Sequence, residues 1–453
     1  MFVVKRMEEF VYKILYGAMH FRIEETPWLH DSPKNRTDIN CLVMLENHLD
    51  VETFRNLMIK KLLNPQDTNG KPLYPRVTKY VCGGLLNYYW KEEVNFQLDD
   101  HVYEWSSNPC KSKAELEDLL SQLAERPLRT DEKRSPWEFI LCHCKDSDGH
   151  KRTAIIFRIS HALADGTSLM YFLVNHLCEN NNLLSKTETR ILTAKQKLFV
   201  RFKSCLYFPY NIARSLLPKF KQPSSFDSSA ISGKKRLIYT KPISLNLVKM
   251  IKSRLNVTVN DVLLGCLSTS LHNYFRKRNE KSPKNFISCI PIDTRLSIDE
   301  AKEFSNKINI TQLALPTSSA DPVKNIQEVH ERMEVTKEAL EGMSMRFGLR
   351  VAASFVPNFL LQNIIRTSVR NTSMIISNVQ GPAHELSVSG RKMNYMVFWP
   401  PCKDHIGASI SILSYNGSVY MGVLSDVNVT EHPEEIIEDL PNIITSLAES
   451  SGY

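Results

Sequence analysis

A chain of 453 residues, with 42% hydrophobic and 23% charged side chains, is expected to fold as a globular protein of two or three domains. Its formal net charge of +8 and sequence pI of about 8.8 suit an anionic small molecule or an anionic membrane surface as partner. The Lys and Arg residues are spread along the chain and form no basic stripe with interleaved aromatics. Nucleic acid is therefore not expected as a partner.

Ten cysteines are scattered without the spacing of a disulfide framework, which predicts reduced core cysteines in a cytosolic protein. Cys142-His143-Cys144 has the residue types of a metal clip. Alternation along a strand would turn His143 away from its two neighbours, and no second ligand pair follows at finger-like spacing. No metal site is therefore expected.

Two stretches bear on membranes. The N-terminal apolar run Met1–Val4 stops at Lys5 and Arg6, so it does not read as a secretory signal. No uninterrupted apolar stretch reaches the roughly 18 residues that a membrane span needs. Residues 195–221 mix Phe, Leu and Tyr with Lys and Arg. This pattern fits a membrane-surface segment, and it fits equally a helix lying across two lobes.

The first part of the chain, residues 1–182, reads as a mixed α/β lobe. Strands are expected at 39–45, 96–98, 102–105, 137–144 and 153–159. Helices are expected at 51–63, 113–124 and 167–178. Between 183 and 235 three prolines and a Ser-rich run predict an interlobe crossover.

The last part, residues 236–453, reads as a second α/β lobe of similar size. It opens with a strand at 236–243, and Ser244 offers a cap for the helix that follows to 255. Further helices are expected at 260–277, from 321 through 343, and at 433–448. Strands are expected at 286–292, 306–315, 374–379 and 388–397, followed by a hairpin of 406–414 with 419–425. The hairpin's Asn416-Gly417 pair predicts a type I′ turn.

His161 stands where a predicted strand meets a predicted helix, and Asp165 and Gly166 follow it in an HxxxDG pattern. A histidine titrates near neutrality, so it can take a proton from a hydroxyl and return it to a leaving group. Acyl transfer from a thioester to an alcohol needs that cycle. The pattern alone fits a structural histidine as well as a catalytic one.

Ser160–Gly166 resembles the HHxxxDG motif of the wax ester synthase/diacylglycerol acyltransferase family. That family belongs to the CoA-dependent acyltransferases of the chloramphenicol-acetyltransferase-like fold. Six further blocks match in the same order, and the resemblance covers about residues 25–445. The blocks are Phe96–Val102 ("FDLDxHV"), Arg126–Leu128 with Ser135–Glu138 ("PLDxxxPLWE"), Val259–Leu264 ("NDVxLA"), Ile290–Arg295 ("PVSVR"), Ser377–Pro382 ("SNVPGP") and Ser414–Gly417 ("SYNG").

The resemblance implies a two-lobe α/β fold with an active-site tunnel between the lobes and His161 as general base near its midpoint. It implies that Asp165 braces the loop against an arginine, for which Arg295 is the candidate. Gly166 is expected to permit the close turn into the helix.

Three further positions follow from the same resemblance. Asn260 lies in the first turn of a predicted helix, where its amide could face a developing oxyanion or could simply cap the helix. Ser377 and Asn378 are expected to shape the tunnel wall. One departure concerns the motif itself, because Ser160 stands where the family has its first histidine. Another is Arg129, which follows Leu128 where the family has Asp.

The function implied is transfer of a long-chain acyl group from acyl-CoA to a long-chain fatty alcohol or to diacylglycerol, with wax ester synthesis favoured. No cofactor is expected beyond acyl-CoA as co-substrate. Peripheral association with the endoplasmic reticulum or lipid droplets is expected, because both acceptors partition into lipid. Two alternatives stay open: a condensation-domain-like acyl transfer, and a catalytically silent lipid-binding protein of the same fold.

Overall fold

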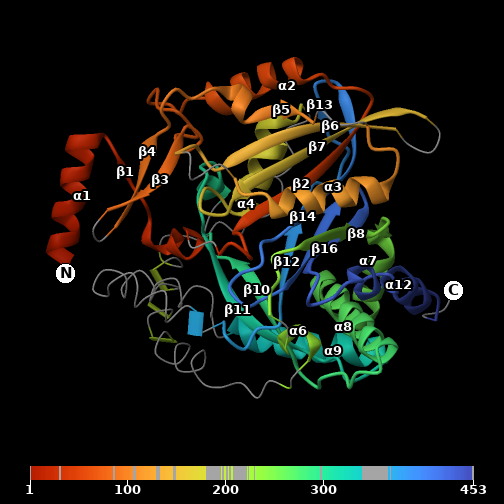
Figure 1. Cartoon of the computed structure of the whole chain (residues 1–453). Coiled ribbons are helices and arrows are strands. Elements are labelled where there is room, and N and C mark those ends of the chain that lie inside the picture. Colours follow the sequence, from red (N-terminus) through yellow and green to blue (C-terminus); the bar gives the residue numbers. More distant parts are fainter. Residues whose placement is uncertain are drawn as a thin grey trace.

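The computed structural model describes residues 2–29, 32–84, 87–105, 109–128, 133–145, 149–179, 224–228, 230–295, 298–338 and 369–450, with a few single residues and pairs between 195 and 222 and at 366–367. The crossover predicted at 183–235, the segment 195–221 and the helix beyond Glu338 therefore lie largely outside the described residues. The described chain is built around two large sheets and one small sheet (Figure 1).

The first large sheet has six strands in the order β13-β14-β2-β7-β6-β5. Its central strands β2 and β7 are antiparallel, with Asp38 opposite Ser160. Both are almost wholly buried, which explains their near-continuous apolar sequences. The strands are β2 (Asp38–Glu46), β5 (Val102–Glu104), β6 (Trp137–Lys145), β7 (Lys151–Ser160), β13 (Ser387–Val388) and β14 (Arg391–Trp399).

The second large sheet has the order β11-β10-β12-β15-β16-β8, with β9 also paired to β16. Within it β12 runs parallel to β10 and β15. Asn416 and Gly417 both have positive φ between β15 and β16, which confirms the predicted type I′ turn. The strands are β8 (Lys235–Tyr239), β9 (Ile243–Ser244), β10 (Phe286–Asp293), β11 (Ile308–Leu315), β12 (Met374–Gln380), β15 (Ala408–Tyr415) and β16 (Ser418–Asp426).

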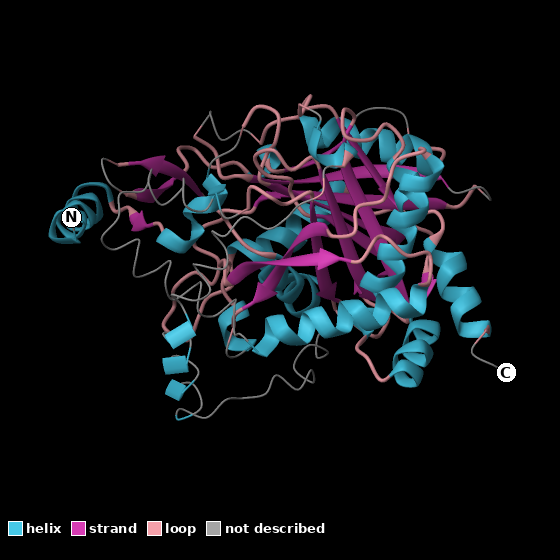
Figure 2. Ribbon diagram, turned by 90° about the horizontal axis from the view of Figure 1, so that it is seen from below, coloured by secondary structure: helices cyan, strands magenta, loops and turns pink. Residues whose placement is uncertain are grey.

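Helices α7 (Leu245–Leu255), α8 (Val259–Lys277), α9 (Pro322–Glu338) and α12 (Leu440–Glu449) gather beside the second sheet. In the view from below, long helices lie in front of the strands (Figure 2). The α8 helix is buried along most of its length and packs against α9 so closely that a side chain at Gly265 would meet Ile326 at 2.4 Å. This contact requires glycine there. The cap of α7 at Ser244 is as predicted in position, but its hydroxyl makes no capping hydrogen bond.

The three helices predicted in the first half agree with their predicted ranges. The α2 helix (Val51–Met58) continues as a π-helical turn at Ile59–Leu63, and α4 (Gly166–Phe172) continues likewise at Leu173–Leu177. The α3 helix (Lys113–Glu125) is capped by Ser112 and buries four leucines at helical spacing, Leu116, Leu119, Leu120 and Leu123. A short helix, α6 (Ser225–Ser228), precedes the second sheet.

An N-terminal helix, α1 (Phe2–Tyr16), lies at the margin of the molecule against a small sheet of order β1-β4-β3 (Figure 1). Its Tyr12 stacks on Tyr89 of β4 with ring centroids 4.1 Å apart. No helix is predicted from the sequence before residue 39, so α1 is a structural finding. The small-sheet strands are β1 (Met19–His20), β3 (Lys79–Gly83) and β4 (Tyr88–Glu92).

Four sequence predictions are corrected. The strand predicted at 236–243 is two strands, β8 and β9. Residues 96–98 form no strand, because His101 is buried against Phe96 and Glu93 and the chain turns there in a 3₁₀ turn, Leu98–Asp100. The strand predicted at 388–397 is two strands, β13 and β14, around Ser389-Gly390 with positive φ at both residues. The helix predicted at 433–448 is a 3₁₀ turn, Pro433–Ile436, followed by α12.

The α/β fold class is confirmed, and the two halves of the sequence are interwoven. The strands β13 and β14 come from the range assigned to the second lobe, yet they complete the first sheet. The α3 helix of the first half in turn contacts β8, where the Ser121 hydroxyl accepts from the Leu237 backbone at 2.9 Å. The lobe boundaries at 182 and 236 stay a prediction.

Candidate active site

His161 directly follows β7, where its backbone N–H donates to the Thr37 carbonyl at 2.8 Å. The side chain is 6% exposed and lines a cavity of about 930 Å³. Ile39 and Phe398 from the first sheet and Ser377 from the second sheet belong to the same walls. The histidine predicted as the reactive group therefore faces a space between the two sheets.

Asn306, just before β11, holds the ring of His161. Its Oδ1 lies 2.8 Å from Nδ1 of His161, and its Nδ2 donates to the His161 backbone carbonyl at 2.7 Å. The second bond fixes which end of the amide is nitrogen, so Oδ1 must accept a hydrogen bond from the Nδ1–H group of His161. The neutral ring then carries its lone pair on Nε2, the atom at the far end of the ring.

One face of the His161 ring is covered by Trp28. The two rings stack with centroids 3.8 Å apart and an interplanar angle of 12°. Lys403 lies over the Trp28 ring, with Nζ 5.4 Å from the ring centroid. The stacking on Trp28 and the hydrogen bond to Asn306 together hold the imidazole of His161 in one orientation.

Burial lowers the pKa of His161 to about 4. The Asp165 carboxylate opposes this effect, and the Lys403 ammonium adds to it. Loss of solvation penalises the imidazolium more than the neutral ring. The ring is therefore neutral at physiological pH and ready to accept a proton.

Asp165 and Arg295 form the pair expected from the sequence. Arg295 Nη2 lies 2.9 Å from Asp165 Oδ1, and the two side chains are 4% and 0% exposed. Asp165 also caps α4 through the Ser168 N–H at 3.0 Å and accepts the Lys307 N–H at 2.8 Å. It ties the turn after His161 to the loop before β11 and does not line the cavity.

Gly166 has an ordinary backbone angle, and a Cβ at this position would make an ordinary van der Waals contact. It is absent from the residues with positive φ, and a Cβ there would lie 3.4 Å from Cγ2 of Val379. Gly166 lines the cavity of His161 and also a second cavity of about 740 Å³. The predicted role of Gly166 in the close turn into the helix stays a prediction.

The second cavity is lined by apolar side chains together with Gly166 and Cys41. It shares Ile39, Val379 and Phe398, besides Gly166, with the cavity of His161. These four shared residues place an apolar chamber directly beside the imidazole. The other lining residues are Val43, Phe139, Ile155, Phe157, Leu169, Met170, Phe172, Leu173, Leu177, Val388, Met396 and Leu413.

Ser377 and Asn378, predicted for the wall, both line the His161 cavity. Asn378 Nδ2 donates to Oδ1 of Asn260 at 2.8 Å, so Asn260 is joined to the wall through this bond. The cap of α8 is Thr258, in a capping box with Asp261. The helix-cap interpretation of Asn260 is therefore wrong, and its predicted part in stabilising an oxyanion stays a prediction.

Ser160 occupies the position of the first motif histidine with its side chain nearly buried. Its hydroxyl accepts the Ala162 N–H at 3.3 Å, and its backbone N–H donates to Pro136. Asp38 lies opposite it on β2. The serine therefore stabilises the turn that presents His161. Arg129 lies outside the described residues.

Sequence reasoning missed Asn306, Trp28 and Glu25. Glu25 Oε1 accepts the Asn306 N–H at 3.1 Å and pairs with Arg76 Nη1 at 2.9 Å. Glu25 therefore helps to hold the Asn306 backbone in place. Burial raises the pKa of Glu25, and Arg76 opposes that rise. These residues carry no spacing signal, since 145 positions separate Asn306 from His161.

Known proteins place this geometry in context. Residues 63–184 match the wax ester synthase/diacylglycerol acyltransferase catalytic domain, and residues 304–448 match the WS/DGAT C-terminal domain. The chain belongs to the wax ester synthase/diacylglycerol acyltransferase family. The first match contains His161, and the second contains Ser377 and Asn378 of the cavity wall and Asn306, so both matched domains contribute to the site.

Three proteins illustrate the family likeness and the fold. The chain is 22% identical over 383 residues to the probable diacyglycerol O-acyltransferase tgs1 of Mycobacterium tuberculosis, covering 79% of this chain and 81% of that protein. The wax ester synthase/diacylglycerol acyltransferase from Marinobacter aquaeolei VT8 superposes with a TM-score of 0.65 at 16% identity, over 96% of this chain and all of that chain. The trichothecene 15-O-acetyltransferase TRI3 from Fusarium sporotrichioides superposes with a TM-score of 0.60 at 12% identity, over 94% and 93%. These superpositions confirm the predicted CoA-dependent acyltransferase fold.

Proposed function

We propose that this member of the wax ester synthase/diacylglycerol acyltransferase family is an acyl-CoA-dependent O-acyltransferase with His161 as general base. The observation that carries the proposal is the bond between Asn306 Oδ1 and His161 Nδ1 at 2.8 Å. It leaves the lone pair on Nε2 of a neutral imidazole beside a cavity.

The reaction begins when Nε2 of His161 removes the proton of the acceptor hydroxyl. The oxygen then attacks the thioester carbonyl, and the tetrahedral intermediate collapses with loss of the CoA thiolate. The imidazolium returns its proton to that thiolate, so the base is regenerated. General acid–base catalysis of this kind contributes about 10²–10⁴ in rate. Asn260 and Asn378 are the proposed amides nearest the developing oxyanion.

The substrate class follows from the apolar chamber. A long alkyl chain in the second cavity would meet apolar groups and would end at the shared residues beside His161. A fatty alcohol brings one unbranched chain to this space, whereas diacylglycerol brings two. We therefore propose a long-chain fatty alcohol as the preferred acceptor, giving wax ester, with diacylglycerol as the second acceptor.

The test uses the purified full chain with labelled palmitoyl-CoA and either hexadecanol or diacylglycerol, with separation of the products and measurement of released CoA. His161→Ala should lower ester formation by about 10²–10⁴. His432→Ala, at an exposed histidine paired with Glu434, is the matched control and should leave the rate unchanged. Equal, near-zero rates for all three proteins would mean a catalytically silent lipid-binding protein instead.

We also propose that the enzyme binds a lipid surface, either the endoplasmic reticulum or a lipid droplet, through α1. One face of α1 packs on the small sheet through Tyr12, while the opposite face exposes six apolar side chains by 44–66%. Exposed apolar groups at helical spacing are typical of helices that lie in a membrane interface. These side chains are Val4, Met7, Phe10, Val11, Ile14 and Leu15.

Two further observations bear on contact with lipid. Leu198, Phe199, Phe202 and Leu206, single described positions within the predicted membrane-surface segment, are also exposed by 62–67%. Among the residues that the structure describes, no helix is both long and apolar enough to cross a bilayer.

Flotation with phosphatidylcholine vesicles and with triolein droplets tests the lipid proposal. Glutamate at Met7, Phe10 and Ile14 should abolish flotation, because three charges would enter the apolar interface. Glutamate at Ile59, Met250 and Val335, which are exposed apolar residues on other helices, is the matched control and should still float. Flotation that survives the α1 changes would assign the contact to another surface.

A further inference from the structure

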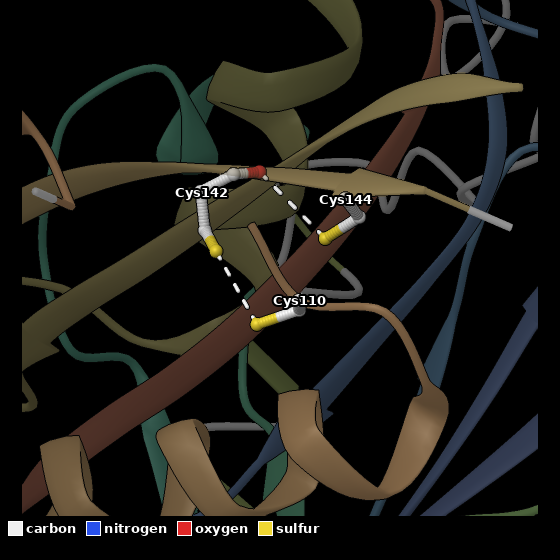
Figure 3. Close-up of side chains that lie close together, drawn as sticks. All are labelled: Cys110, Cys142 and Cys144. Carbon is white, nitrogen blue, oxygen red and sulfur yellow. Dashed lines mark hydrogen bonds between the residues drawn. The ribbon is translucent and has the colours of Figure 1, made fainter. Parts of the chain in front are cut away.

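Three cysteine side chains converge at one end of the first sheet, away from His161. Cys142 and Cys144 alternate on β6 and so share one face of that strand. Cys110 comes from the extended segment between β5 and α3, and it forms a parallel bridge with Cys144. Figure 3 shows the three sulfur atoms turned into one space.

The sulfur atoms stand at ligand-like separations. Sγ of Cys110 lies 3.5 Å from Sγ of Cys142, and all three sulfur atoms lie within 4.8 Å of one another. Zinc–thiolate bonds of about 2.3 Å in a tetrahedron place two sulfur atoms about 3.8 Å apart. Small side-chain movements would therefore bring all three thiolates onto one ion.

The backbone around the cluster is fixed before any ion binds. The Cys110 N–H donates to the His143 carbonyl at 3.1 Å, and the Cys110 carbonyl accepts the Lys145 N–H at 3.0 Å. Cys110 and Cys144 are 7% and 8% exposed, and Cys142 is 1% exposed. A small ion can reach such a site, while the three donors need little ordering on binding.

His143 takes no part in the cluster. As the alternation predicts, it lies on the opposite face of β6, where Nε2 is 3.1 Å from Glu104 and the ring contacts His48. Within the described ranges, no imidazole or carboxylate joins the three thiols. A bound ion would therefore keep one coordination position for a water molecule.

We propose that Cys110, Cys142 and Cys144 form a thiolate site for one zinc ion. Thiolates select soft ions such as Zn²⁺ and Cu⁺ over Mg²⁺ and Ca²⁺. Three thiolates leave a net charge of −1 with Zn²⁺ and −2 with Cu⁺, and the smaller residual charge is cheaper to bury. Zn²⁺ therefore fits this buried site better than Cu⁺ does.

The site has a structural consequence, because Cys110 lies two residues before the Ser112 cap of α3. That helix reaches the second sheet, where Glu117 accepts the Tyr239 N–H at 3.0 Å and Glu125 accepts the Lys235 N–H at 2.8 Å. Zinc at the cluster would fasten the start of α3 to β6 and so strengthen the connection between the sheets. This role is independent of the proposed acyl transfer.

The experiment measures zinc per chain in the full-length protein, purified under reducing conditions after growth with zinc. One zinc per chain is expected, with loss of the metal in Cys110→Ser and in Cys144→Ser. Cys266→Ser, at a buried cysteine of α8, is the matched control and should keep its zinc. Equal zinc content in all four proteins, or none in the unaltered chain, would overturn the proposal.

Thermal unfolding separates loss of metal from a general folding defect. A chelator should lower the Tm of the unaltered protein and of Cys266→Ser, but leave the Tm of Cys144→Ser unchanged. An equal effect on all three proteins would contradict a zinc site at the cluster. Preferential retention of Cu⁺ in an anaerobic competition, or a Cys110–Cys142 disulfide in freshly isolated protein, would also replace zinc as the explanation.

Discussion

The side-chain amide of Asn306 contacts His161 twice, at the ring nitrogen Nδ1 (2.8 Å) and at the backbone carbonyl (2.7 Å). His161 follows a strand of the first sheet, whereas Asn306 precedes a strand of the second. The orientation of the base therefore depends on the two sheets being docked. Positioning of this kind matters, because a misplacement of about 1 Å can cost about 10²-fold in rate.

Asn306→Ala should lower kcat by about 10²-fold, because the ring loses the partner that fixes its tautomer and its orientation. The KM for acyl-CoA should change little, since Asn306 does not line either cavity. Steady-state kinetics check this split. Gln312→Ala, on the same edge of the second sheet, is the control. A parallel loss of stability and of both kinetic constants would point to a merely structural asparagine.

The pH dependence should reflect the buried imidazole. Burial lowers the pKa of His161 to about 4, so the basic form persists from neutral pH down to about pH 5. We expect kcat/KM to be level across that range and to fall only at lower pH, as the ring takes up a proton. Lys403→Met removes a cation that lowers this pKa, so the acid limb should move to higher pH. A limb near the ordinary histidine value of about 6.5 would contradict the prediction.

Arg295→Met should destabilise the fold by about 3–5 kcal/mol, because the buried Asp165 carboxylate would lose its charged partner. Urea unfolding measures the change. The control is Lys277→Met, whose ion pair with Glu438 is 44% and 46% exposed and should be worth less than about 1 kcal/mol. Similar losses in the free energy of unfolding for the two variants would show that Arg295 is not the main partner that stabilises Asp165.

Gly166→Ala should shift the preferred acyl donor or acceptor toward shorter chains. The new methyl group would lie 3.4 Å from Val379, at the wall that the two cavities share, and would narrow the passage between them. Phe398→Ala should widen the same wall and shift the preference the other way. Competition among substrates of graded chain length measures both effects, and shifts in the same direction would disprove the assignment of this wall.

Local patterns in the sequence predict much of the fold. Leucines at helical spacing predict α3, apolar runs rich in β-branched and aromatic residues predict β6 and β7, and Asn416-Gly417 predicts the hairpin turn, because each depends on neighbours in the chain. The helix α1 is not predicted from the sequence, because only the length of the N-terminal apolar run is considered. Its Val4, Met7, Val11 and Ile14 recur every three or four residues between charges, which is a helical period.

The site is only partly accessible to such reasoning. The motif blocks lead to His161, Asp165 and Arg295, because the family resemblance carries their order along the chain. Asn306 and Trp28 belong to no such block, and their contacts with His161 arise only when distant segments fold together. The contact between Cys110 and Cys142 likewise arises only when separate segments of the chain fold together.

The pairing of β14 with β2 has a consequence for synthesis of the protein on the ribosome. Trp399 lies opposite Asn40, so one side of β2 stays without its neighbour until residues 391–399 have been made. An uncovered strand edge is a template for wrong pairing and aggregation. The nascent chain should therefore need protection by chaperones until its last strands emerge, and fragments that end before residue 391 should be insoluble.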